Sequence, residues 1–134
     1  MTQPTRPIRI LLVDDSEQVL WGLGKLIDGE RHRMRVVGKA RNVAEALAGV
    51  REHQPDVVLL DIYLAEDNSL DYLPEMLQGS KARVLVLTGA GDPEVHRRAM
   101  KLGACAVVTK EQPAQVLLDA IVEAHSEPAY RGAM

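Results

Sequence analysis

The sequence contains no phenylalanine, and aromatic residues make up only 3% of its 134 positions. Cysteine is equally scarce, since Cys105 is the single cysteine and an intrachain disulfide bond needs two. A chain of this length can bury an apolar core without disulfides, so a disulfide-stapled secreted domain is excluded. A reducing compartment, the cytoplasm, is therefore the expected location.

The sequence also lacks a surplus of positive charge and a long apolar run. It has 16 lysines and arginines against 19 aspartates and glutamates, for a formal net charge of −3. Because a phosphate backbone attracts proteins with a basic field, we expect no nucleic-acid contact by this segment. No apolar run approaches the roughly 18 residues of a membrane span, and the N-terminus lacks the pattern of a signal peptide. We expect one soluble domain without a membrane contact.

Five short apolar runs alternate with segments of helical period. The runs cover 8–13, 34–37, 57–60, 84–87 and 105–108. Each is rich in valine, isoleucine and leucine, which is typical of a parallel strand buried on both faces. Strands that alternate with helices predict an α/β fold, a doubly wound five-stranded parallel sheet with helices on both faces.

Residues that favour helix ends place the helices between these strands. Ser16 and Asn42 are N-cap candidates for the first two helices, and Asp92 is one for the fourth. The third helix is irregular, because Ser69 can cap it but Pro74 falls within it and lacks a backbone donor. We therefore expect a late start or a kink in the third helix.

Polar residues follow four of the predicted strands. Asp14 and Asp15 follow the first strand, Asp61 ends the third, Thr88 follows the fourth and Lys110 follows the fifth. Each alone is typical of a solvated turn or surface, but ligands of an open parallel sheet bind at this edge. If the first and third strands are neighbours in the sheet, the three carboxylates converge and repel one another unless a cation lies among them, and hard oxygen ligands suit Mg²⁺. The recurrence at one sheet edge predicts a metal-dependent site.

Four segments of the chain resemble receiver domains of response regulators in two-component signalling. They are ILLVDD at 10–15, PDVVLLDI at 55–62, VLVLTG at 84–89 and LGACAVVTK at 102–110. The resemblance implies a receiver domain over 1–125, a tail or linker over 126–134, and a flavodoxin-like strand order 2-1-3-4-5. The stretches VLWGL at 19–23 and RVVGKA at 35–40 are more similar to receivers that precede a helix-turn-helix output domain.

The resemblance also implies chemical roles for the acidic residues. Asp61 would be the phosphoacceptor, phosphorylated by a sensor histidine kinase or a histidine phosphotransfer protein. Asp15, Asp61 and the backbone carbonyl of Tyr63 would hold Mg²⁺, with Asp14 acting mostly through water. The Mg²⁺ ion is thus the cofactor that the resemblance implies.

Two further residues would contact the phosphoryl group, and three positions depart from the family pattern. Thr88 and Lys110 would bind the phosphoryl oxygens, and inward movement of Thr88 would shift the loop that follows it.

The family usually has an aromatic residue where this chain has Val107, which is too short to swing between two sites. It usually has proline and glycine where this chain has Ala65 and Ser69. We expect a domain that is phosphorylated but transmits without an aromatic rotamer switch.

Three apolar residues are candidates for partner contacts. Trp21 lies opposite the apolar stripe of the first helix, at about 100° per residue, and is predicted to face solvent. Leu118 and Val122 fall outside the core stripe of the fifth helix and would form half of a homodimer contact. The plainer interpretation is that Trp21 lies flat over its neighbours and that the other two are scattered surface residues.

The leading hypothesis is therefore a phosphorylation-dependent switch, which loses its own phosphoryl group but is not an enzyme acting on an external substrate. One alternative is that the chain is the N-terminal receiver of a longer DNA-binding transcription regulator. A lesser alternative is a magnesium-dependent aspartate phosphohydrolase of similar fold, but Ser16 stands where that class has a second aspartate after Asp14. A nucleotide-binding module would need a glycine-rich or hydroxyl-rich loop in place of DDSE.

Overall fold

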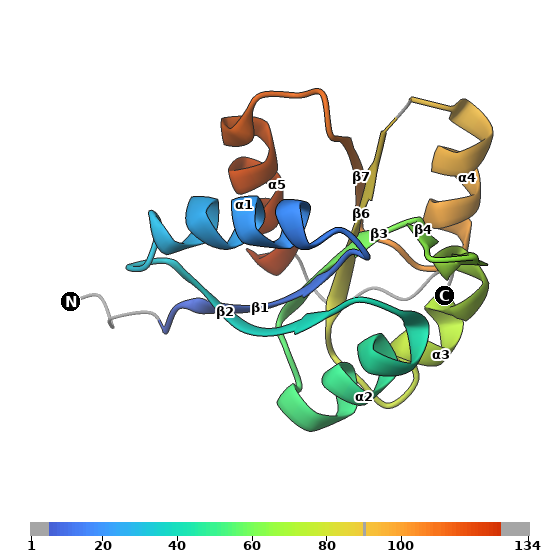
Figure 1. Ribbon diagram of the computed structural model, residues 1–134, viewed down its shortest axis with the longest axis horizontal. Coiled ribbons are helices and arrows are strands. Elements are labelled where there is room, and N and C mark those ends of the chain that lie inside the picture. Colours follow the sequence, from blue (N-terminus) through green and yellow to red (C-terminus); the bar gives the residue numbers. More distant parts are fainter. Residues whose placement is uncertain (1–5, 90, 127–134) are drawn as a thin grey trace.

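A five-stranded parallel sheet forms the centre of the protein in a computed structural model that describes residues 6–89 and 91–126. Its strands lie in the order β2-β1-β3-β6-β7 (Figure 1). They are β1 Ile8–Val13, β2 Met34–Ala40, β3 Val57–Asp61, β6 Arg83–Thr88 and β7 Ala106–Thr109. Counted among these five strands, the order is 2-1-3-4-5, so the predicted doubly wound fold is confirmed.

Helices cover both faces of the sheet (Figure 1). They are α1 Glu17–Asp28, α2 Val43–His53, the 3-10 helix η1 Ser69–Tyr72, α3 Leu73–Leu77, α4 Pro93–Lys101 and α5 Ala114–Ser126. One apolar cluster joins the sheet to α2, α3 and α4, and a second joins it to α1 and α5. Neighbouring β1 residues show the strand period, because Leu11 packs in the first cluster and Leu12 in the second.

The predicted N-caps close the first, second and fourth helices. The Ser16 hydroxyl accepts a hydrogen bond from the backbone N–H of Val19, and the Asn42 side chain accepts one from Glu45. Asp92 does the same at the start of α4. Each such cap stabilises a helix by about 1 kcal/mol, so these local signals help to fix where the chain leaves each strand.

The third helix starts late, as expected, but its cap differs from the prediction. The 3-10 turn η1 precedes α3, and Pro74 lies in the first turn of α3, where a missing backbone donor costs little. Asn68, and not Ser69, accepts the capping hydrogen bond from the backbone N–H of Leu70. The Ser69 cap is therefore wrong, because the Ser69 hydroxyl is turned toward the backbone carbonyl of Asp61.

The expectation that Leu118 faces away from the core is also wrong. Leu118 is only 4% exposed and packs in the same cluster as Leu117 and Ile121. Val122 is partly buried against that cluster. The reason is that α5 lies over β3, β6 and β7 together, so a broader face of the helix is covered than a single stripe.

The ends of the chain add two observations. Helix α5 runs to Ser126, and the rest of the predicted tail over 126–134 lies outside the described residues. Among the residues that the structure describes, no helix has the length and apolar composition to cross a membrane.

Candidate metal centre

Three carboxylates converge at the carboxyl edge of the sheet, as the sequence predicts. Asp14 and Asp15 follow β1, and Asp61 is the last residue of β3, which pairs with β1 in parallel. One ligand oxygen from each of the three lies within 4.8 Å of the others. Asp14 is buried and Asp15 is exposed, so the cluster has a closed side and a side open to water.

Lys110 places a positive charge beside the carboxylates. Its ammonium Nζ donates a hydrogen bond to Asp14 Oδ2 at 3.1 Å and lies 3.5 Å from Asp61 Oδ1. Its backbone N–H donates to the carbonyl of Thr88 at 2.7 Å, which fixes the start of the loop after β7 against the end of β6. The sheet thus brings together the acidic residues and the lysine that the sequence singled out.

The electrostatics of the site leave its negative charge only partly compensated. Burial, followed by the charge of Asp14, raises the pKa of Asp61 from 3.8 to about 6, although Lys110 opposes this. Burial lowers the pKa of Lys110, but its hydrogen bond to Asp14 and the charge of Asp61 outweigh burial and raise that pKa overall. Lys110 therefore stays protonated and offsets part of the charge of the three carboxylates, so the site is suited to a further cation.

Hydrogen bonds from backbone N–H groups orient two of the carboxylates. Asp14 Oδ1 accepts from Ser16 at 2.9 Å. Asp15 Oδ2 accepts from Ala65 at 2.9 Å, and Ala65 lies in the loop that follows β3. Sequence reasoning treated Ala65 only as a departure from a pattern. The donor was missed, because it depends on where the loop backbone lies.

A short antiparallel hairpin carries the remaining predicted ligand. Strands β4 Tyr63–Leu64 and β5 Asp67–Asn68 pair directly after Asp61, and Tyr63 pairs with Asn68. The ring of Tyr63 is exposed, so its side chain is not part of the core. Participation of the Tyr63 carbonyl in metal binding stays a prediction.

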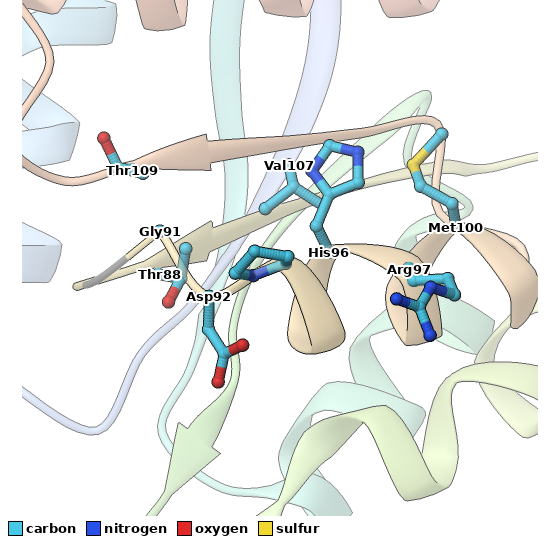
Figure 2. A pocket seen from close by; sticks show the side chains of 9 residues that line it. Thr88, Gly91, Asp92, His96, Arg97, Met100, Val107 and Thr109 are labelled. Atoms are coloured by element: carbon cyan, nitrogen blue, oxygen red, sulfur yellow. The ribbon is translucent and has the colours of Figure 1, made fainter.

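Thr88 of β6 and Val107 of β7 line the same pocket. Thr88 ends β6 and is nearly buried, and it lines a cavity of about 640 Å³ together with Val107, His96 and Met100. Figure 2 shows the His96 imidazole of α4 directed toward Val107 of β7. The position where the resemblance predicts a ring therefore borders open space.

The donor set of the cluster fits Mg²⁺. This ion prefers hard oxygen ligands, binds through one or two carboxylates and keeps several waters. The exposed side of Asp15 leaves room for those waters, and the half-buried Asp61 supplies a second carboxylate. Cysteine and histidine, the ligands typical of zinc sites, do not contribute to this cluster.

The doubly wound sheet, with its carboxylate cluster, threonine and lysine at one edge, defines the chain as a flavodoxin-like α/β domain with an acidic site at the carboxyl edge of its sheet. Residues 10–122 match the response regulator receiver domain family, and the chain belongs to that family.

Two relatives and one solved structure illustrate the similarity. The chain is 38% identical over 129 residues to protein-glutamate methylesterase/protein-glutamine glutaminase 3 of Burkholderia thailandensis, covering 92% of this chain and 34% of that protein. It is 34% identical over 115 residues to the uncharacterized transcriptional regulatory protein YvfU of Bacillus subtilis, covering 85% and 57%. The response regulator domain of Thermotoga maritima CheB superposes with a TM-score of 0.84 at 28% identity, covering 92% of this chain and 99% of that domain.

Proposed function

We propose that the chain is a phosphorylation-dependent switch in which Asp61 accepts a phosphoryl group with the help of Mg²⁺. The observation that carries the proposal is the meeting of three carboxylates with the Lys110 ammonium, 3.5 Å from Asp61 Oδ1. Phosphoryl transfer needs little covalent help beyond the nucleophile, and depends mainly on positioning and on positive charge around the phosphoryl oxygens. The cluster offers both.

In the proposed reaction, a carboxylate oxygen of Asp61 forms a bond to the phosphorus of a phosphohistidine. The nitrogen–phosphorus bond of the donor breaks, its imidazole leaves with that electron pair, and the leaving nitrogen takes a proton from solvent. The product is an acyl phosphate on Asp61, which water later hydrolyses. The donor is a sensor histidine kinase or a histidine phosphotransfer protein, and we place the exchange in the cytoplasm.

The residues that would hold Mg²⁺ are Asp15, Asp61 and the carbonyl of Tyr63, with Asp14 acting through water. When bound, the ion supplies positive charge that neutralises the phosphoryl oxygens. Lys110 supplies a second positive charge from the β7 side. The hydroxyl of Thr88, at the end of β6, donates a hydrogen bond to the phosphoryl group. This contact draws the loop after Thr88 inward.

Partner contacts are the second half of the proposed function. Trp21 on α1 is 65% exposed, as predicted, and the Lys25 ammonium lies 5.5 Å from its ring centroid. An exposed tryptophan beside a cation is a suitable anchor for a partner protein. A homodimer would use a different set of residues from the one we expected, because Leu118 is in the core.

Binding of beryllofluoride, a phosphoryl mimic, tests the proposed phosphorylation. With Mg²⁺ present, we expect the wild-type chain to bind beryllofluoride in a ¹⁹F NMR titration and to gain one phosphoryl group from acetyl phosphate by intact-mass measurement. The Asp61→Asn variant should do neither. A wild type that fails both assays, or a variant that matches it, would contradict the proposal.

A second candidate function concerns the protein from which the chain comes. The chain spans 57% and 56% of the length of two transcriptional regulators that it resembles, and 34% of a methylesterase. We propose a receiver that precedes the DNA-binding domain of a transcription regulator. The genomic sequence after the codon for Met134 tests this, because an in-frame methylesterase domain or a stop codon would contradict it.

A further inference from the structure

The loop after Asp61 is closed at its base by a buried serine. The backbone N–H of Ser69 donates to the carbonyl of Ile62 at 2.6 Å, and the Ser69 hydroxyl donates to the carbonyl of Asp61 at 2.5 Å. Ser69 has no exposed surface. Two consecutive carbonyls of the chain that leaves β3 are therefore fixed by one residue, and glycine or alanine at position 69 could supply only the backbone donor.

The tip of the same loop reaches the second carboxylate of the site. Ala65 has a φ of +56°, and its backbone N–H donates to Asp15 Oδ2 at 2.9 Å. A positive φ is uncommon for a residue with a side chain. Proline at position 65 could satisfy neither condition, because its ring fixes φ near −65° and it has no N–H.

The two contacts join the acidic residues through the hairpin β4–β5. Ser69 holds the backbone of Asp61, while Ala65 holds one oxygen of the Asp15 side chain. Because three carboxylates repel one another, the exposed Asp15 would otherwise swing toward water. The hydrogen bond to Oδ2 opposes that movement.

We propose that Ala65 and Ser69 are positioning residues that arrange Asp15 and Asp61 for Mg²⁺ before the ion binds. This inference rests on the proposed function, since it assumes that the acidic cluster is a Mg²⁺ site. It assigns a role to the two loop residues that depart from the pattern. Residues that orient metal ligands through hydrogen bonds typically change metal affinity 10- to 100-fold when they are replaced.

Calorimetric titration of the full chain with Mg²⁺ alone tests the inference. We expect Ala65→Pro to raise the Mg²⁺ Kd about 10-fold. Ala65→Gly keeps the N–H and accepts a positive φ, so its Kd should stay within about twofold of the wild type. Ser69→Ala should raise the Kd several-fold. Its matched control is Ser126→Ala. This variant removes a hydroxyl that donates a hydrogen bond to the carbonyl of Val122 at the C-terminal end of α5.

Folding and Mg²⁺ binding are separated by a second measurement. Circular dichroism at the titration temperature identifies the variants that are folded, and beryllofluoride binding at saturating Mg²⁺ should return close to wild type in each folded variant. Wild-type Kd values in folded Ala65→Pro and Ser69→Ala would overturn the inference, as would an equal loss in Ala65→Gly. If the wild type itself binds no Mg²⁺, the proposed function fails, and the inference fails with it.

Discussion

Asp61 holds its charge at a cost to folding. Its side chain is 13% exposed and shares its surroundings with Asp14, which together raise its pKa to about 6. Between about pH 4 and pH 6 the folded chain therefore binds more protons than the unfolded chain. Stability falls as pH rises through this window and stays lower above it. A residue kept at such a cost is a candidate for function.

The Asp61→Asn variant should be more stable than the wild type at pH 7.5. Removing the charge abolishes the penalty, which is about 1–3 kcal/mol for a carboxyl whose pKa rises from 3.8 to about 6. The gain should vanish near pH 4, where the wild-type carboxyl is protonated. Urea unfolding at both pH values, in metal-free buffer, measures the difference.

Glu52 provides the control for this experiment, because it is an exposed carboxylate on α2. Glu52→Gln should change the free energy of unfolding by less than about 0.5 kcal/mol at either pH. An Asp61→Asn variant that is no more stable than the wild type at pH 7.5 would show that Lys110 already compensates the charge.

The sequence predicts the charged residues of the site better than their orientation. Asp14, Asp61 and Lys110 could be named because each stands at the end of an apolar strand or directly after it, and parallel strands end at one edge. Ala65 could not be given a role, because its contact with Asp15 depends on a positive φ, which an alanine in the sequence does not indicate. Ser69 was assigned the wrong hydrogen bond because its neighbour Asn68 supplies the cap, and the Ser69 hydroxyl donates to the carbonyl of Asp61 instead.

At the scale of elements, α4 is the helix with the weakest hold on the core. Ala99 is its one buried residue, whereas α1 has three and α5 has four. Arg98 forms an ion pair with Asp71 of η1, which ties α4 to the segment that follows Asp61. Elements with few buried contacts open most readily, so α4 is suited to move.

Removing this tie should loosen α4 without unfolding the domain. In Arg98→Ala, backbone amides of α4 should exchange with deuterium faster than in the wild type. The cost in overall stability should stay below about 1 kcal/mol, because both partners are exposed. Hydrogen–deuterium exchange with mass spectrometry measures the change.

Arg97→Ala is the matched control, since Arg97 pairs with Glu94 inside the same helix. It removes an equal charge but no contact between elements. Equal acceleration of exchange in both variants would mean that helix propensity, and not the pair with Asp71, holds α4.

The pocket between α4 and β7 makes a prediction about signal transmission. Val107 lines an open pocket of about 640 Å³ together with Thr88 and His96, so a larger side chain at position 107 would extend into that pocket. In Val107→Tyr, beryllofluoride with Mg²⁺ should produce larger amide shift changes along α4 and β7 than in the wild type. A two-dimensional NMR titration gives this comparison.

Val116→Tyr is the control, because Val116 is exposed on α5 away from the pocket. Wild-type shift changes and wild-type partner binding in Val107→Tyr would show that Val107 is not the element that limits transmission.

Secondary structure could be predicted where the local signals were strong. The starts of two helices could be predicted from Ser16 and Asn42, and both side chains accept the capping hydrogen bonds. Strand β2 runs three residues further than expected, to Ala40, because pairing with β1 continues past Gly38 through an irregular register. The buried position of Leu118 could not be foreseen, since helical period does not show how many strands lie beneath α5.

At the scale of the whole molecule, aliphatic side chains and methionine fill the core, where many proteins also bury aromatic rings. The largest fully buried side chains of the described residues are isoleucine, leucine and methionine, while Trp21 and Tyr63 are exposed. Two clusters of this kind sandwich the sheet. Periodicity predicts such a sandwich, but it does not order the strands, and the order was expected only from the resemblance to receiver domains.

The site joins residues from three strands of the sheet, so metal binding should stabilise the entire fold. Asp14 and Asp61 end two central strands, and Lys110 follows the edge strand β7. An ion that binds only the folded chain stabilises it by about 2.7 kcal/mol at a concentration 100 times its Kd. Addition of Mg²⁺ should therefore raise the Tm, and chelation with EDTA should reverse the rise.

The rise in Tm should also depend on pH in a defined direction. Because the pKa of Asp61 is about 6, a proton competes with Mg²⁺ below that pH, and the same Mg²⁺ concentration should raise the Tm less at pH 5 than at pH 7.5. Scanning calorimetry at both pH values measures the rise in Tm. The Asp61→Asn variant is included because it lacks the carboxylate for which the proton and Mg²⁺ compete. An equal rise in Tm at both pH values would indicate that the stabilising ion binds away from Asp61, because only an ion at that carboxylate must displace its proton.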